Sequence, residues 1–222
     1  MKQNPNKTIQ DSGKLHMLCG NFEDFFSEKV TMQNILEEII MLLFGKRQPK
    51  DVIPVTIDLC DDYFVLNGKQ FTIPAKVSEL IDILGEPRCV ADKNKDIKDY
   101  KEMVCEKYNL SPEKFSEMDY YWDNLGLMAS THDRKTVYCF WIKLDNAKKY
   151  PMEMAKYNFS GTLLINSRLW QEVVEETGGN SHTFYMKLGK LHANVIRYGS
   201  KAKDVKQFQV QLNDGEEFKY FD

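Results

Sequence analysis

The sequence predicts an α+β protein in which a mainly antiparallel sheet carries short helices packed against it, with a helical element at the N-terminus. Three observations lead to this prediction: an Asn-Gly pair between two apolar runs, a series of short strand-like runs in the second half, and brief helical runs between them. A core is expected because 42% of the 222 residues are hydrophobic and 12% are aromatic. We expect residues 1–50 to form a helical extension and residues 51–222 to form one α+β domain.

The N-terminal element is predicted from the apolar spacing within residues 22–44. Its second part repeats at i, i+3, i+4, i+7, i+8 and i+11, the period of one helix face. This stripe consists of Met32, Ile35, Leu36, Ile39, Ile40 and Leu43. Glu37 and Glu38 interrupt the apolar run, and the run is too short to cross a bilayer. We therefore expect the stripe to pack on the rest of the chain or on a partner.

The best-defined local structure lies between Val52 and Pro87. Asn67-Gly68 between apolar runs predicts a tight hairpin, because a type I′ turn needs positive φ at both central positions. The residues that follow place apolar side chains on one face of a short helix, namely Val77, Leu80, Ile81 and Leu84. Gly85 is expected to end that helix, with Pro87 preventing its continuation.

Residues 100–108 have a helical pattern, and Ser111-Pro112-Glu113 has the composition of another helix start. Tyr120–Ser130 and Thr136–Leu144 are predicted to be strands. In the second of these we expect Tyr138, Phe140, Ile142 and Leu144 on one face and Val137, Cys139 and Trp141 on the other, which makes the strand central in its sheet. The remaining predictions are a helix at Leu169–Thr177 and strands at Phe159–Ile165, Thr183–Leu188, Leu191–Tyr198 and Val205–Leu212.

The charge balance argues against nucleic acid as the main ligand. The chain has 30 basic and 33 acidic residues, whereas phosphate binding needs a clustered positive surface. The polar first residues lack the apolar core of a signal peptide, and five scattered cysteines form no CxxC pair. We therefore expect a cytoplasmic protein with reduced thiols and no membrane segment.

No motif for catalysis, metal binding or cofactor binding is found. The four histidines are separated by at least ten residues and have no metal-ligand neighbour at i+3 or i+4. Gly45-Lys46 lacks the remaining residues of a phosphate-binding loop, and the sequence has no G-x-S-x-G elbow. We expect no catalytic residue, no metal and no cofactor.

The clearest polar clusters combine acids with aromatic residues. Asp58, Asp61 and Asp62 lie beside the predicted hairpin, and three further acids flank the run Tyr120-Tyr121-Trp122. Acids in turns usually bind backbone amides or face water, although paired carboxylates can also serve as general acid and base. An acidic, aromatic surface also suits a protein partner, because rings supply contact area and charges steer association. The candidate partner-binding residues are Asp61, Asp62, Asp119, Tyr120, Tyr121, Asp123 and Asp133.

Three segments resemble an uncharacterised bacterial domain family: Ile73–Arg88, Tyr121–Gly126 and Phe159–Leu163. The order of a helix, Gly-x-Pro and then strands is also similar to inhibitor modules of the β-lactamase-inhibitor type. The resemblance covers Val55–Leu212 and implies a relation to immunity proteins, which neutralise a bacterial toxin by occluding it. It transfers no functional residue, because the motifs look structural, with Trp122 expected in the core.

Three hypotheses follow. The first is a non-catalytic protein-binding module, an immunity protein that presents an acidic, aromatic surface to a toxin. The second is a hydrolase, which requires a pocket holding at least two of Asp58, Asp61, Asp62, Asp123 and His132. The third is a structural or assembly subunit that associates through the Met32–Leu43 stripe. The sequence favours the first and does not specify the partner or the oligomeric state.

Overall fold

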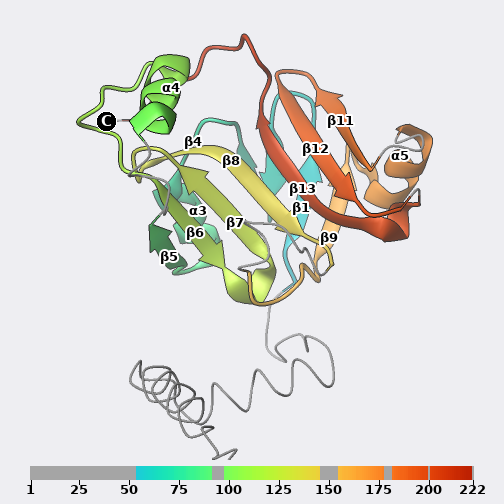
Figure 1. Ribbon diagram of the computed structural model, residues 1–222. Helices are drawn as coiled ribbons and strands as arrows, with labels where there is room; N and C mark the ends of the chain where they lie inside the picture. Colours follow the sequence, from blue (N-terminus) through green and yellow to red (C-terminus); the bar gives the residue numbers. More distant parts are fainter. Residues whose placement is uncertain (1–53, 92–97, 146–154, 178–181, 200, 222) are drawn as a thin grey trace, which may run out of the picture. The chain divides into compact units, whose positions relative to one another are not determined.

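The structure is a computed structural model that describes residues 54–91, 98–145, 155–177, 182–199 and 201–221. The chain divides into two units, Met1–Arg47 and Gln48–Asp222, and all described residues belong to the second unit. The predicted N-terminal extension of residues 1–50, with the Met32–Leu43 stripe, lies outside the described residues. Within them the fold is α+β, as the sequence predicts (Figure 1).

The larger sheet of the described residues is antiparallel throughout. Its strands, in spatial order, are β11 (Thr183–Leu188), β12 (Leu191–Arg197), β13 (Val205–Leu212), β8 (Thr136–Lys143), β7 (Leu127–Thr131), β6 (Met118–Trp122) and β5 (Arg88–Ala91), and β4 (Ala75–Lys76) also pairs with β8. β8 is central, as predicted, because β13 pairs with one of its edges and β7 with the other.

A second, smaller sheet corrects the prediction of one sheet. Its strands, in spatial order, are β10 (Arg168–Leu169), β9 (Thr162–Ile165), β1 (Thr56–Leu59), β2 (Phe64–Leu66) and β3 (Lys69–Phe71). β1 and β9 run parallel, with Ile57 opposite Leu163, although more than a hundred residues separate them. The predicted Asn67-Gly68 turn joins β2 to β3, and both residues have positive φ.

The main core lies between the two sheets. Phe64 of the smaller sheet and Phe140 of the larger sheet stack with their ring centroids 5.1 Å apart, and both side chains are fully buried. Two short helices close this core, α3 (Val77–Leu84) through Val77 and Leu80, and α5 (Trp170–Thr177) through Val174. The predicted end of α3 is confirmed, since the N–H of Gly85 donates to the carbonyl of Ile81. The third helix, α4 (Lys98–Tyr108), lies at the other end of the domain from α5 (Figure 1).

Two predicted elements differ in the structure. The expected strand Tyr120–Ser130 is a hairpin, because the 3₁₀ turn Asp123–Leu125 and the left-handed Gly126 reverse the chain between β6 and β7. The expected helix at Ser111-Pro112 is a single turn closed by the Lys114 N–H to the Ser111 carbonyl. In both segments a local turn forms where the sequence pattern predicts a continuous element.

The faces of β8 also differ from simple alternation. A bulge between β7 and β8 pairs Thr131 with Val137 and Ser130 with Cys139, so that Tyr138 is an extra residue. Val137 therefore shares the core face with Phe140, while Tyr138 packs with Cys139 against the outer cluster. The predicted grouping of Tyr138 with Phe140, and of Val137 with Cys139, is wrong for this reason. This bulge turns Tyr138 toward the feature described next.

Candidate functional site

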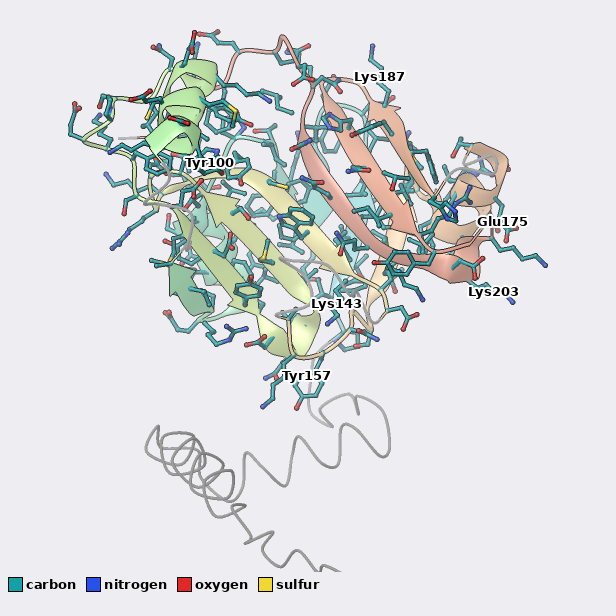
Figure 2. The ribbon with its side chains drawn as sticks, viewed as in Figure 1. Tyr100, Lys143, Tyr157, Glu175, Lys187 and Lys203 are labelled. Atoms are coloured by element: carbon teal, nitrogen blue, oxygen red, sulfur yellow. The ribbon has the colours of Figure 1, made fainter. Side chains whose placement is uncertain are left out.

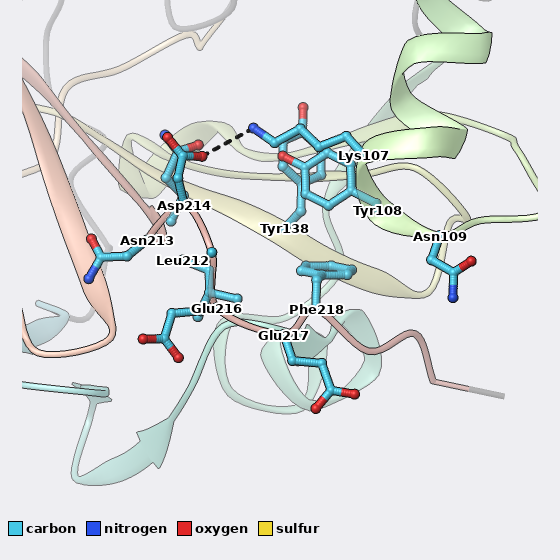
Figure 3. A pocket seen from close by; sticks show the side chains of 12 residues that line it. Lys107, Tyr108, Asn109, Tyr138, Leu212, Asn213, Asp214, Glu216, Glu217 and Phe218 are labelled. Atoms are coloured by element: carbon cyan, nitrogen blue, oxygen red, sulfur yellow. Dashed lines mark hydrogen bonds and ion pairs between the residues drawn. The ribbon is translucent and has the colours of Figure 1, made fainter.

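An aromatic cavity of about 360 Å³ opens where the end of α4, the bulged start of β8 and the segment after β13 meet (Figure 3). Its volume lies in the range typical of ligand sites, about 300–1,000 Å³. The residues that line it are Lys107, Tyr108, Asn109, Tyr138, Gln211, Leu212, Asn213, Asp214, Gly215, Glu216, Glu217 and Phe218. Below, this feature is called the aromatic cavity.

Three rings from distant parts of the chain form its apolar surface. Tyr108 is the last residue of α4, the bulge supplies Tyr138, and Phe218 comes from the C-terminal segment. The centroid of the Tyr108 ring lies 5.9 Å from that of Tyr138 and 5.2 Å from that of Phe218. Tilted and edge-on arrangements at these separations are favourable, so the three rings hold one another in place.

A buried polar cluster supports this surface from behind. The ring of His132 stacks on that of Tyr138, with centroids 3.8 Å apart and planes within 9°. His132 Nδ1 lies 2.9 Å from Glu117 Oε1, and the side chains of His132 and Glu117 are 2% and 4% exposed. The Tyr100 hydroxyl donates to the same Glu117 oxygen across 2.8 Å. A buried, hydrogen-bonded carboxylate of this kind fixes the position of the histidine and, through it, of Tyr138.

Burial changes the acidity of the tyrosine in the cavity. The pKa of Tyr138 is raised well above its ordinary value, chiefly because burial disfavours the phenolate and secondly because Cys139 adds unfavourable charge interaction. Burial likewise raises the pKa of Tyr108. Both side chains therefore keep their hydroxyl protons at neutral pH, and the cavity presents neutral rings with polar hydroxyls.

The rim of the cavity is acidic. Among the described residues that line it, Asp214, Glu216 and Glu217 are acids and Lys107 is the one base. Lys107 Nζ lies 3.4 Å from Asp214 Oδ1, along one side of the cavity in Figure 3, and both side chains are exposed. The same ammonium lies 5.3 Å from the centroid of the Tyr108 ring. Solvent screens an ion pair this exposed, so it holds the lysine only weakly.

The acids predicted beside the first hairpin lie outside the aromatic cavity, and two of the three bind backbone. Asp62, at φ 72°, accepts the N–H of Lys190 at 2.6 Å. Asp58 accepts the N–H of Ser167 at 3.0 Å, as well as its hydroxyl. Asp61 is exposed and lies 3.4 Å from the amide of Asn166. These carboxylates stabilise the loops at one end of the smaller sheet.

Three of the predicted partner-binding residues are buried, which corrects their expected exposure. Asp119, Tyr120 and Tyr121 are only 7%, 8% and 1% exposed, because each of them lies on β6, which is paired with β5 on one edge and β7 on the other. The Asp119 carboxylate accepts the hydroxyl of Ser130, and the Tyr120 hydroxyl donates to the carbonyl of Arg134. Their side chains offer almost no surface to a partner in this structure.

The other two predicted residues stabilise turns. Asp133 accepts the N–H groups of Lys135 and Thr136 and the hydroxyl of Thr136, at 2.6 to 2.9 Å. Asp123 accepts two hydrogen bonds from the Arg88 guanidinium, at 2.6 and 2.9 Å. Of the residues in the hydrolase hypothesis, Asp62 borders one hollow and Asp123 a different one, while His132 is buried behind Tyr138.

The three motifs that carry the resemblance meet at one joint. Trp122 donates its indole N–H to the carbonyl of Gly85 across 2.7 Å and is 3% exposed, as expected of a core residue. Arg88 binds Asp123, as described above, and lies over the ring of Tyr121. A Cβ on Gly126 would lie 2.2 Å from the backbone nitrogen of Phe159. Segments distant in sequence are thus locked together, which gives these motifs a structural role.

The family model for a domain of unknown function, DUF7738, matches residues 56–180, which is more than half of the 222 residues. The chain belongs to the DUF7738 family. The matched span of the DUF7738 domain contains both sheets' first strands and all three motifs, whereas β11, β12, β13 and the C-terminal segment follow it. No curated protein and no solved structure matches the chain.

Three further observations describe this DUF7738 member. Among the described residues, no group of three or more His, Cys, Asp or Glu side chains is arranged to hold a metal ion. None of the helices in the described ranges has the length and apolar character needed to cross a membrane. The four cysteines within those ranges, Cys60, Cys89, Cys105 and Cys139, are free thiols.

Sequence reasoning missed the residues that form the aromatic cavity. Tyr108 and Tyr138 were each assigned to an element, but no local pattern indicates that a bulge and a helix end bring them together. Phe218 follows the last predicted strand in a stretch that gave no prediction. No local signal in the sequence indicates the bulge, because Tyr138 lies in a strand that is apolar on both faces.

Proposed function

We propose that this domain is a non-catalytic protein-binding module that acts in the cytoplasm as an immunity protein, occluding a bacterial toxin. The observation that carries the proposal is the aromatic cavity, where three neutral rings lie inside an acidic rim. Protein interfaces place aromatic residues at their centre and polar residues around them. The immunity role itself rests on the resemblance of the Ile73–Arg88, Tyr121–Gly126 and Phe159–Leu163 motifs.

The placement of the acids favours binding over hydrolysis. A general acid and base must face the same substrate, within hydrogen-bond reach of it. Asp58, Asp62 and Asp133 instead accept backbone N–H groups in separate turns, and Asp123 is bound by Arg88. The assembly-subunit hypothesis depends on the Met32–Leu43 stripe, which lies outside the described residues.

The test begins with the full chain as bait in its native host. The captured protein is then expressed in cells with and without this chain, and growth is measured. An immunity protein restores growth and forms a stable complex with the toxin. A purified chain that turns over a metabolite, and loses that turnover on Asp123→Asn substitution, would show the proposal to be wrong.

A matched pair of variants tests the surface. Glu216→Lys reverses a charge on the rim of the cavity, and Glu175→Lys makes the same change on α5, at the other end of the domain from α4 and Tyr100 (Figure 2). Both glutamates are exposed, so folding tolerates either change. We expect Glu216→Lys to weaken the complex about tenfold, a loss of about 1.4 kcal/mol, and Glu175→Lys to leave it unchanged.

A further inference from the structure

The aromatic cavity has the chemistry of a cation site. Ring faces attract a cation through their quadrupole, and this attraction is greatest where several rings surround a site that excludes water. Tyr108, Tyr138 and Phe218 supply such rings, and the rim adds three acids against one base. A neutral or anionic ligand would gain nothing from this balance of charge, whereas a cation interacts favourably with both the rings and the carboxylates.

The protein already holds a cation at the edge of the cavity. Lys107 places its ammonium 5.3 Å from the Tyr108 centroid and 3.4 Å from Asp214 Oδ1. Its side chain is 56% exposed, so it lies at the mouth and leaves the interior of the cavity to another group. Lys107 thus marks where positive charge is favourable, and it competes with any cation that enters.

The size of the aromatic cavity and the hydrogen-bond acceptors of its lining residues favour arginine among the cationic side chains. A guanidinium is planar, so it can stack on a ring while its N–H groups donate in its own plane. Tyr138 and Asp214 both line the cavity, and a tyrosine hydroxyl and a carboxylate can each accept such hydrogen bonds. A lysine ammonium has the charge but lacks the flat surface.

We propose that the aromatic cavity receives an arginine side chain of the protein partner, stacked against Tyr108, Tyr138 or Phe218 and bound by Asp214. This inference rests on the proposed function and identifies the chemical group that the partner contributes. In an occluding complex, a basic residue of the toxin is then buried against the inhibitor.

The cavity can be tested with small probes and without the partner. N-acetyl-arginine methylamide is titrated into the full chain while the ring resonances of Tyr108, Tyr138 and Phe218 are followed by NMR. The matched probe is N-acetyl-citrulline methylamide, which has the same shape and no charge. We expect the arginine probe to shift these resonances with an affinity at least about tenfold higher than that of the citrulline probe. Equal affinities, or no shift with the arginine probe, would overturn the inference.

Substitutions of Lys107 and Asp214, which form an ion pair, should change the affinity for arginine in opposite directions. Asp214→Asn removes an acceptor and a charge, so arginine binding should weaken about three- to tenfold. Lys107→Gln removes the competing cation and frees Asp214, so binding should instead tighten severalfold. Glu175→Gln, on α5, should change nothing. Since Lys107 and Asp214 are both exposed, a merely structural effect would give losses in both variants, and a loss in Lys107→Gln refutes the competition.

The two proposals fail in different ways. If a partner is captured and neutralised but the arginine probe does not bind, the proposed function stands and the arginine inference is lost. If the probe binds as expected but the chain captures no partner and protects no cell, the cation site stands and the immunity function is lost.

Discussion

The motif joint around Gly126 should be far less tolerant of a methyl group than the hairpin at Gly68. Both glycines have positive φ, +65° and +83°, a conformation that costs a residue with a side chain about 1–2 kcal/mol. At Gly68 a Cβ meets nothing within 4 Å, whereas at Gly126 it would lie 2.2 Å from Phe159 N and 2.5 Å from Asn158 C. The comparison therefore separates steric overlap from backbone strain.

The magnitude follows from the atoms that must move. The close atoms at Gly126 belong to backbone, which cannot rotate away, and overpacking of this kind costs about 1–3 kcal/mol. Displacing Phe159 also strains its N–H bond to the carbonyl of Lys143, where a net hydrogen bond contributes about 0.5–1.5 kcal/mol. We expect Gly68→Ala to cost about 1–2 kcal/mol and Gly126→Ala at least about 2 kcal/mol more.

Urea unfolding followed by circular dichroism measures the difference. With a slope of about 2 kcal/mol per molar urea, an additional loss of about 2 kcal/mol lowers the midpoint by about 1 M relative to Gly68→Ala. Equal midpoints for the two variants would refute the reasoning, because they would mean that the contact of Gly126 with Phe159 is not close. A changed slope in either variant would mean that the unfolding reaction itself differs.

Three further outcomes follow from the structure. Trp122→Phe should cost about 1–3 kcal/mol in the same unfolding assay, since it removes the hydrogen bond to the Gly85 carbonyl and leaves space beside a side chain that is 3% exposed. Cys139 should react with a thiol reagent only on unfolding, because burial raises its pKa, whereas the exposed Cys89 should react at once; equal rates would contradict this. The pKa of Glu176, measured by NMR, should lie below that of an ordinary glutamate because Arg168 donates to it, and should rise on Arg168→Gln. The Arg168–Glu176 pair therefore stabilises the fold above pH ~4.3, and this stabilisation is lost as the pH falls through the lowered pKa of Glu176. An unchanged Glu176 pKa in the Arg168→Gln variant would refute the assignment.

Sequence patterns predict the elements whose structure is decided locally. Asn67-Gly68 specifies a turn by backbone conformation, Gly85 ends α3 by the same property, and the alternation in Val205–Leu212 reproduces the bounds of β13. A strand that is apolar on both faces is predicted to be central in its sheet whichever strands pair with it. This is why the central position of β8 could be predicted from its own residues. Each of these predictions depends on neighbours within a few residues.

Long-range pairing accounts for what the sequence could not show. The parallel partner of β1 is β9, and no local pattern connects Ile57 with Leu163. The bulge at Tyr138 depends on how β7 meets β8, and it reverses which side chains face the core. Asp119 on β6 is predicted as a partner-binding residue because acidic side chains favour exposure, but it is buried with a hydrogen bond from Ser130. The aromatic cavity could not be predicted for the same reason, since its rings come from three distant segments.

The position of β13 also bears on how recombinant fragments of this protein should be chosen. A recombinant fragment trimmed to the matched span, residues 56–180, would lose β13. The edge of β8 that pairs with Gln207–Gln211 would then have backbone N–H and C=O groups without hydrogen-bond partners. An exposed strand edge of this kind can form backbone hydrogen bonds with a strand of another molecule, which leads to aggregation. Fragments ending at residue 180 should therefore precipitate on expression, whereas those reaching Phe221 keep both edges of β8 covered.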